Sequence, residues 1–170
     1  MRGEGLKGEE PMGFQISGLK REQFQDLLCF DDDALAAHGA KRYVADTQSG
    51  FPCRVSLIDA DPGENVILLT FKHQPACGPY HGAGPIFVRE HAKDTSLEPN
   101  QVPDLLRTRL LSVRAYDAND MMVEADVVDG LDLENLLQRF LDNVAVSYMH
   151  VHFARPGCFA CRVDRALLHG

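Results

Sequence analysis

The sequence has no long apolar segment and no recognisable export signal. Its longest run of large aliphatic residues is Val66-Ile67-Leu68-Leu69, far short of the roughly 20 residues that a membrane-spanning helix needs. Residues 1–11 alternate glycine with glutamate and lysine and lack the apolar core of a secretory signal. We therefore expect a cytoplasmic protein without a membrane partner.

The chain also lacks an excess of basic residues and an even set of cysteines. Its formal net charge is -8 at pH 7, whereas nucleic-acid binders use a basic face to neutralise phosphates. A nucleic-acid partner is therefore not expected. The five cysteines are an odd number at irregular spacing, which is typical of reduced thiols and not of a disulfide framework.

Length and composition indicate one ordinary globular domain. Hydrophobic residues make up 45% of the chain and charged residues 25%, a balance typical of globular proteins. A chain of 170 residues has room for one domain with a substantial core. We expect residues 1–13 to be a peripheral leader and residues 14–170 to form a single globular domain. A homo-oligomer is left open.

Apolar periodicity predicts eight or nine strands and three or four helices. In the clearest helix, residues 133–141, apolar side chains recur at helical spacing along one stripe. Residues 74–85 contain three prolines and three glycines and predict a long loop. The other expected helices are residues 20–30, 31–39 and 104–109, and the expected strands are residues 14–19, 41–46, 51–57, 65–73, 86–89, 111–116, 121–128, 144–153 and 159–165. Because helices and strands do not alternate regularly, we expect an α+β fold, a mostly antiparallel, strongly curved sheet with three or four helices packed on it.

Chemically versatile side chains are concentrated near the end of the chain. In a strand over residues 144–153, His150 and His152 share one face with Tyr148. Two imidazoles at this spacing can bind a metal, move a proton or pair structurally. The pattern leaves these roles open.

A zinc site is one alternative. Cys158 and Cys161 extend the two histidines to His-x-His followed by Cys-x-x-Cys, which offers four zinc ligands. An extended backbone over these residues would point the two thiols to opposite faces, however. Zinc bound by His150, His152 and Cys158, with or without Cys161, is therefore an alternative and not the favoured interpretation.

A repeated pattern points to arginines. Phe-x-Cys-Arg-Val occurs at residues 51–55 and 159–163. If both segments are strands, their Phe, Cys and Val side chains face a core, and Arg54 and Arg162 face the other side, where Cys158 could join them. Guanidinium groups there could hold a carboxylate or phosphate. They could equally pair with acids of the protein such as Asp164.

The glycine-rich loop and a cysteine offer further candidates. Residues 72–85 include His73, His81 and Cys77 and could form a lid, a rim or an ordinary surface loop. Their glycine spacing matches no phosphate-binding motif. Cys158 with His150 or His152 as its base is a candidate for cysteine catalysis, although no third residue that orients the base is evident.

Four separated motifs carry a resemblance. They are GFPCRVSL at residues 50–57, GPIFVR at residues 84–89, SVRAYD at residues 112–117, and HVH at residues 150–152 continuing to GCF at residues 157–159. Over roughly residues 14–165 the chain resembles the bacterial family called domain of unknown function 1203. The resemblance implies a small single-domain bacterial protein without an assigned activity. Its relatives carry Asn in place of Phe153 and no cysteine in place of Cys161, which speaks against a four-ligand zinc site. The positions it favours for testing are Arg54, Arg89, Arg114, His150, His152 and Cys158.

We predict a protein that binds, or acts on, a small anionic ligand in a pocket of histidine, arginine and cysteine side chains. The arginines would fix the anion, and the histidines would donate hydrogen bonds or move protons. No cofactor is predicted, zinc binding is the first alternative, and a non-enzymatic protein-interaction module is the second. Whether the protein is an enzyme is left open. The catalytic candidates are His150, His152 and Cys158, and the predicted ligand-binding residues are Arg54, His73, Arg89, Arg114, His150, His152 and Arg162.

Overall fold

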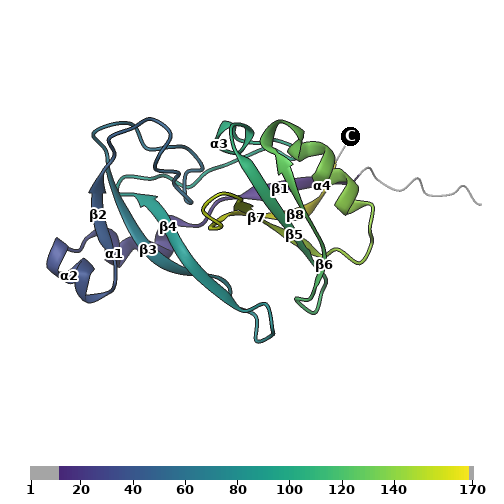
Figure 1. The fold of residues 1–170 in the computed structure, drawn as a ribbon, viewed down its shortest axis with the longest axis horizontal. Coiled ribbons are helices and arrows are strands. Elements are labelled where there is room, and N and C mark those ends of the chain that lie inside the picture. Colours follow the sequence, from purple (N-terminus) through teal and green to yellow (C-terminus); the bar gives the residue numbers. More distant parts are fainter. Residues whose placement is uncertain (1–11, 169–170) are drawn as a thin grey trace, which may run out of the picture.

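Two separate antiparallel sheets form the framework of the protein (Figure 1). The computed structural model describes residues 12–168, and within them eight strands and four α-helices are present. The α+β class and the antiparallel pairing are confirmed, but the strands divide between two sheets instead of forming one. The expected leader, residues 1–13, lies outside the described residues except for Met12 and Gly13, which already belong to the first strand.

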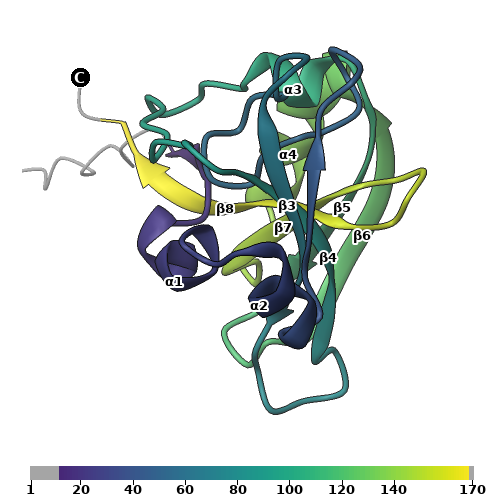
Figure 2. The ribbon, with the colours of Figure 1, turned by 90° about the vertical axis from the view of Figure 1, so that its left-hand side faces the viewer.

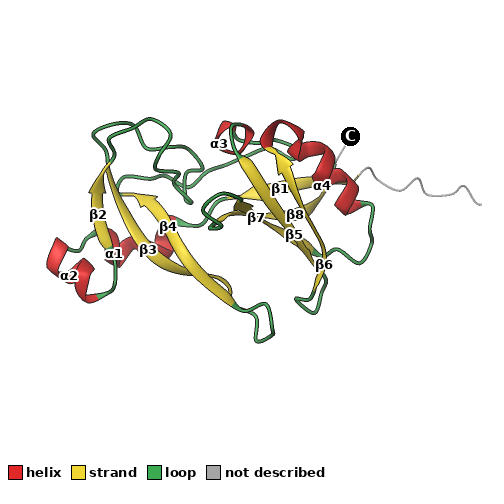
Figure 3. Ribbon diagram, viewed as in Figure 1, coloured by secondary structure: helices red, strands yellow, loops and turns green. Residues whose placement is uncertain are grey.

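The larger sheet carries α4 (Leu133–Leu141) on one face (Figure 3). All five residues of the apolar stripe on α4 are buried, as predicted from its spacing. They pack against Met149 and Val151 of the central strand, whose six residues are all buried. That strand starts at Tyr148, later than the expected start at residue 144. In spatial order the strands are β1 (Met12–Ser17), β8 (Phe159–Leu167), β7 (Tyr148–Phe153), β5 (Leu110–Tyr116) and β6 (Met122–Asp129).

The smaller sheet has one face that reaches the larger sheet. On its middle strand, Ile67 and Leu69 pack with the first helical segments of the chain (Figure 2). Phe71 follows on the same face, and its ring lies 6.3 Å from the ring of Phe159 on β8. The strands are β2 (Lys41–Val44), β3 (Asn65–Gln74) and β4 (Gly82–Arg89), and the helical segments are η1 (Arg21–Phe24), α1 (Gln25–Leu28) and α2 (Asp32–Ala37). Because β4 begins at Gly82, the loop expected over residues 74–85 is shorter than predicted.

Residues 51–57 fold into a tight turn, so the strand expected there is absent. The amide of Leu57 donates to the carbonyl of Cys53 at 3.1 Å, and the segment takes part in isolated bridges and not in a strand. The amide of Arg54 donates to Phe87 at 3.0 Å, and its carbonyl accepts from Leu19 at 2.8 Å. The Arg54 backbone is thereby fixed between β4 and the start of the first helical segment.

A β-bulge between β7 and β8 decides where the side chains of residues 159–163 point. Val151 pairs with Cys161, but His152 pairs with Phe159, so Ala160 is an extra residue on β8. Cys161 therefore faces the core beneath α4, whereas Phe159 contacts the imidazole of His150. The prediction that Phe159 and Cys161 share one face is wrong, because it assumed a regular strand.

The remaining helical segments are short. They are α3 (Asp104–Arg107) and η2 (Gly130–Asp132). Over residues 12–168, no helix has both the length and the apolar character needed to cross a membrane.

Candidate functional site

Three histidine side chains from the two sheets meet at one point. His73 comes from β3, and His150 and His152 come from one face of β7. The ring centroid of His73 lies 5.0 Å from that of His152 and 6.2 Å from that of His150. One ligand nitrogen from each ring lies within 4.8 Å of the other two. Strand alternation thus places two imidazoles together, and packing of the sheets adds the third. We call these residues the histidine cluster.

Three nitrogens of the histidine cluster are buried without a hydrogen-bond partner. They are Nδ1 of His73, Nδ1 of His150 and Nε2 of His152. The other nitrogen of His152, Nδ1, donates to the carbonyl of Gly157 at 3.2 Å, which leaves the lone pair on Nε2. A buried polar atom without a partner costs about 1–3 kcal/mol. Three such atoms within one small cluster make it a candidate ligand site.

Burial keeps the rings of the cluster neutral. It lowers the pKa of His150 to about 3, with further contributions from His152 and Arg162. It lowers the pKa of His152 to about 4, assisted by the positive charge of Arg114, and it also lowers the pKa of His73. The neutral imidazole is the form that binds metal ions. The three rings are therefore able to ligate a metal at neutral pH.

Two arginines flank His150 across the larger sheet. Arg114 on β5 and Arg162 on β8 are its paired residues on either side. The guanidinium of Arg162 binds Asp164 at 2.8 Å and lies 4.1 Å from the centroid of the Tyr148 ring. Within residues 12–168, Arg114 has no carboxylate at ion-pair distance. Arg114 therefore brings an unneutralised positive charge to the cluster.

Aromatic and polar side chains hold the cluster in place. The ring of Phe159 stacks on His73 at 5.6 Å, with an angle of 5° between the planes. The Tyr148 hydroxyl accepts from Gln74 at 2.8 Å and donates to Asp120 at 2.6 Å. Burial, together with the bond to Asp120, raises the pKa of Tyr148 to about 12. This hydroxyl therefore stays protonated and links β3 to β7 and to the turn between β5 and β6.

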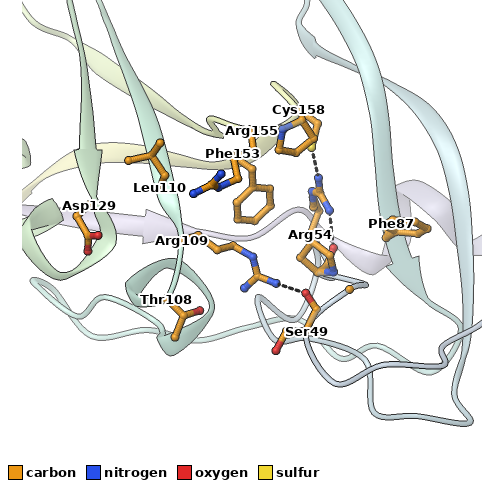
Figure 4. A pocket seen from close by; sticks show the side chains of 13 residues that line it. Ser49, Arg54, Phe87, Thr108, Arg109, Leu110, Asp129, Phe153, Arg155 and Cys158 are labelled. Carbon is orange, nitrogen blue, oxygen red and sulfur yellow. Dashed lines mark hydrogen bonds between the residues drawn. The ribbon is translucent and has the colours of Figure 1, made fainter.

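Arg54 and Cys158 lie in a different place, a cavity of about 470 Å³ that none of the three histidines lines (Figure 4). Nη2 of Arg54 donates to Sγ of Cys158 at 2.9 Å. Nε donates to the carbonyl of Phe159 at 2.8 Å, and Nη1 donates to the carbonyl of Pro52 at 2.5 Å. We call this the Arg54 cavity, and its lining residues are Ser49, Gly50, Pro52, Arg54, Phe87, Thr108, Arg109, Leu110, Asp129, Phe153, Arg155, Pro156 and Cys158.

The structure therefore divides the residues that the sequence suggested for one pocket. His73, His150 and His152 lie together, with Arg114 and Arg162 beside them, and Arg54 and Cys158 lie in the Arg54 cavity. Arg89 lies in neither place. Its guanidinium pairs with Glu64 at 2.5 Å. Cys161 is on the face of the sheet opposite to the imidazoles, so the ligand set of His150, His152, Cys158 and Cys161 does not assemble. Cys158 has Arg54 as its hydrogen-bond partner, and neither candidate base is bonded to it.

Some residues of the Arg54 cavity and of the surroundings of the histidine cluster were not predicted from the sequence. Arg109 and Arg155 line the Arg54 cavity, and Phe159 lies against the imidazoles. The run Arg155-Pro156-Gly157 is a typical turn sequence, which could have placed Arg155 on an exposed connection next to Cys158. The position of Phe159 depends on the bulge, for which the sequence gives no signal.

The fold and the histidine cluster define an α+β domain with a candidate three-histidine metal site. The chain belongs to the family described as Protein of unknown function (DUF1203), whose model matches residues 50–165. No curated protein and no solved structure matches the chain.

Proposed function

We propose that the protein binds a divalent transition metal ion of the zinc type through His73, His150 and His152. The observation that carries this proposal is the set of three unpaired imidazole nitrogens in one buried cluster. One ion can accept a lone pair from each of the three rings, since one ligand nitrogen of each lies within 4.8 Å of the other two. In this proposal His73 replaces the two cysteines of the zinc alternative drawn from the sequence.

The surroundings of the cluster suit a metal. The carbonyl of Gly157 orients His152 in the manner of the outer hydrogen bonds that support metal-binding histidines. Three histidines leave a fourth position free, as in catalytic zinc sites. A tetrahedral ion with Zn–N bonds of about 2.1 Å holds its nitrogens roughly 3.4 Å apart. Binding would thus draw the rings slightly inward from their present separations of up to 4.8 Å.

We propose in addition that a small anion occupies the fourth position. A divalent ion here would add two positive charges beside Arg114, and none of the three ligands carries a negative charge. A carboxylate, a phosphate or a hydroxide would offset this excess and bind both the ion and Arg114. The proposal thus keeps the anionic ligand predicted from the sequence. The imidazoles, however, bind the metal and not the anion.

Titration of metal-stripped protein tests the metal site. Calorimetry with Zn²⁺ should give one ion per chain, and Co²⁺ should develop the intense visible absorption of tetrahedral coordination. His73→Ala should abolish both signals, and since His73 is only half-buried, this variant should remain folded. His81→Ala changes an exposed histidine outside the cluster and should bind like the unaltered protein. Absence of binding, or equal binding by both variants, would contradict the proposal.

Spectroscopy of the Co²⁺ protein tests the anion. Azide and phosphate should change the visible spectrum of the unaltered protein. Arg114→Gln should keep the Co²⁺ affinity and weaken the effect of the anions about tenfold, the loss expected from removal of one charge-assisted hydrogen bond. Arg139→Gln, at an exposed arginine on α4, is the matched control. An unchanged anion response in Arg114→Gln would leave the metal site standing but remove the role of Arg114.

A further inference from the structure

The Arg54 cavity is rich in positive charge and has an aromatic wall. Three arginines line it, and Asp129 is the only acidic lining residue in the described part of the chain. The ring of Phe153 lies between two of them, with its centroid 4.9 Å from Cζ of Arg54 and 5.2 Å from Cζ of Arg109 (Figure 4). The cavity thus combines cationic groups with a flat apolar surface, which suits a small organic anion.

Arg54 is a buried charge without a carboxylate partner. The residue is 1% exposed, and its three acceptors are two backbone carbonyls and the sulfur of Cys158. A guanidinium has five N–H groups, so one hydrogen on each terminal nitrogen is left without a partner among residues 12–168. Burial of an unpaired charge is unfavourable by several kcal/mol. An anion in the cavity, or negative charge on the sulfur, would offset this cost.

The other two arginines differ in how far they are neutralised. Arg109 pairs with Asp59 at 2.7 Å and also donates to the carbonyl of Ser49 at 3.0 Å. Arg155 stands exposed on the turn after β7 and has no hydrogen-bond or ion-pair partner within residues 12–168. Arg155 is therefore available to bind an incoming anion.

Cys158 supplies a nucleophile at the wall of the same cavity. Its side chain is partly exposed, and its Sγ accepts a hydrogen bond from Nη2 of Arg54 at 2.9 Å. Cysteine reacts as the thiolate, and a neighbouring guanidinium stabilises negative charge on sulfur. Cys53 and Cys161, by contrast, are fully buried, and Cys29 and Cys77 are exposed at the surface outside the cavity.

We propose that the Arg54 cavity is a second site, in which Arg155 and Arg54 bind the carboxylate or phosphate of a small molecule and Cys158 attacks an electrophilic carbon of that molecule. This site is independent of the metal proposed for the histidine cluster. In the displacement, the S–H proton passes to solvent, a bond forms from Sγ to the carbon, and the leaving group departs with the electrons of its bond. The hydrogen bond from Nη2 of Arg54 holds the sulfur at the wall of the cavity for the attack.

Paired alkylating reagents test this site. Iodoacetate and iodoacetamide carry the same reactive carbon and the same leaving iodide, but only iodoacetate has a carboxylate. Mass spectrometry of the peptides gives the rate at each cysteine, with exposed Cys77 as the internal reference. The ratio of the iodoacetate rate to the iodoacetamide rate should be about tenfold higher at Cys158 than at Cys77, because a cationic cavity concentrates anions. Phosphate at millimolar concentration should protect Cys158 and leave Cys77 unaffected.

Two variants distinguish anion binding by Arg155 from an effect of the overall charge of the protein. Arg155→Gln should lower the iodoacetate preference of Cys158 toward that of Cys77, and since Arg155 is exposed and unpaired, the fold should be unaffected. Arg139→Gln removes the same charge on α4, away from the cavity, and should change nothing. The proposal fails if Cys158 shows no preference for iodoacetate over Cys77, if phosphate does not protect it, or if both variants behave alike.

Discussion

His73 and His152 face each other edge to face from different sheets, with ring centroids 5.0 Å apart and planes at 88°. One belongs to β3 of the smaller sheet and the other to β7 of the larger sheet. A ligand that binds both rings therefore ties the two sheets together.

Zinc should stabilise the protein against unfolding, and the gain should require His73. An ion that binds only the folded chain adds about 2.7 kcal/mol to the free energy of unfolding when its concentration is one hundred times its Kd. Urea unfolding with and without zinc measures the gain. His73→Ala should show none of it, and His81→Ala should show all of it. An equal gain in both variants would mean that zinc binds elsewhere.

The metal-free protein should lose stability in acid below pH 6.5. In the folded state the pKa of His150 is lowered to about 3 and that of His152 to about 4, whereas in the unfolded chain both are near 6.5. Between these values the unfolded chain binds more protons, so the free energy of unfolding falls as the pH falls, by about 1.4 kcal/mol per pH unit for each ring.

Comparison of variants isolates this effect from that of the carboxylates. Glu64 also has a lowered pKa, so acid weakens the fold through other groups as well. Urea titrations at several values between pH 4 and pH 6.5 should give a shallower pH dependence for His150→Phe than for the unaltered protein. Parallel curves for the two proteins would show that folding does not lower the pKa of His150.

Loss of the Arg54 side chain should be costly, whereas loss of Arg162 should not. Arg54→Leu leaves two buried carbonyls and a thiol without their donor, and we expect a loss of about 3 kcal/mol in the free energy of unfolding. Arg162 is exposed, and its contacts are an ion pair with Asp164 and the face of the Tyr148 ring, so Arg162→Leu should cost less than about 1 kcal/mol. Chemical denaturation of both variants checks the contrast. Similar losses would indicate that the contacts of Arg54 contribute little.

Gly157 should matter both for stability and for metal binding. Its φ of 78° lies in the left-handed region, so Gly157→Ala should cost about 1 kcal/mol. Because its carbonyl accepts from His152, the strain should also weaken metal binding roughly tenfold. Gly84→Ala is the control, since an added Cβ there meets open space. Calorimetric titration with Zn²⁺ measures the metal affinity of both variants. An unchanged affinity in Gly157→Ala would show that this carbonyl does not position the His152 ring.

Much of the local structure follows from the sequence. The apolar stripe of α4 and the alternation along β7 are short-range patterns, and both are confirmed. For the same reason the shared face of His150 and His152 could be predicted, because it requires only a strand. Arg162 also lies on the expected face of the sheet, opposite to the face that carries Cys161.

The parts that could not be predicted depend on long-range packing or on one extra residue. Nothing in the sequence near His73 shows that β3 packs against β7, so its contact with the other two imidazoles becomes visible only in three dimensions. The pattern of residues 51–57 looks extended, but contacts with Leu19 and Phe87 fold it into a turn. The bulge at Ala160 reverses the direction of Phe159, because one added residue shifts strand alternation by one position.

Attachment to two sheets has a kinetic consequence for any ion held by the histidine cluster. Two ligands come from β7 and one from β3, and His150 and His152 are almost fully covered. Azide or phosphate needs only the fourth position, but a multidentate chelator must replace the imidazoles themselves, and we expect this to require the sheets to move apart. In excess chelator, the dissociation rate should thus become independent of the chelator concentration and equal the rate constant of that local opening.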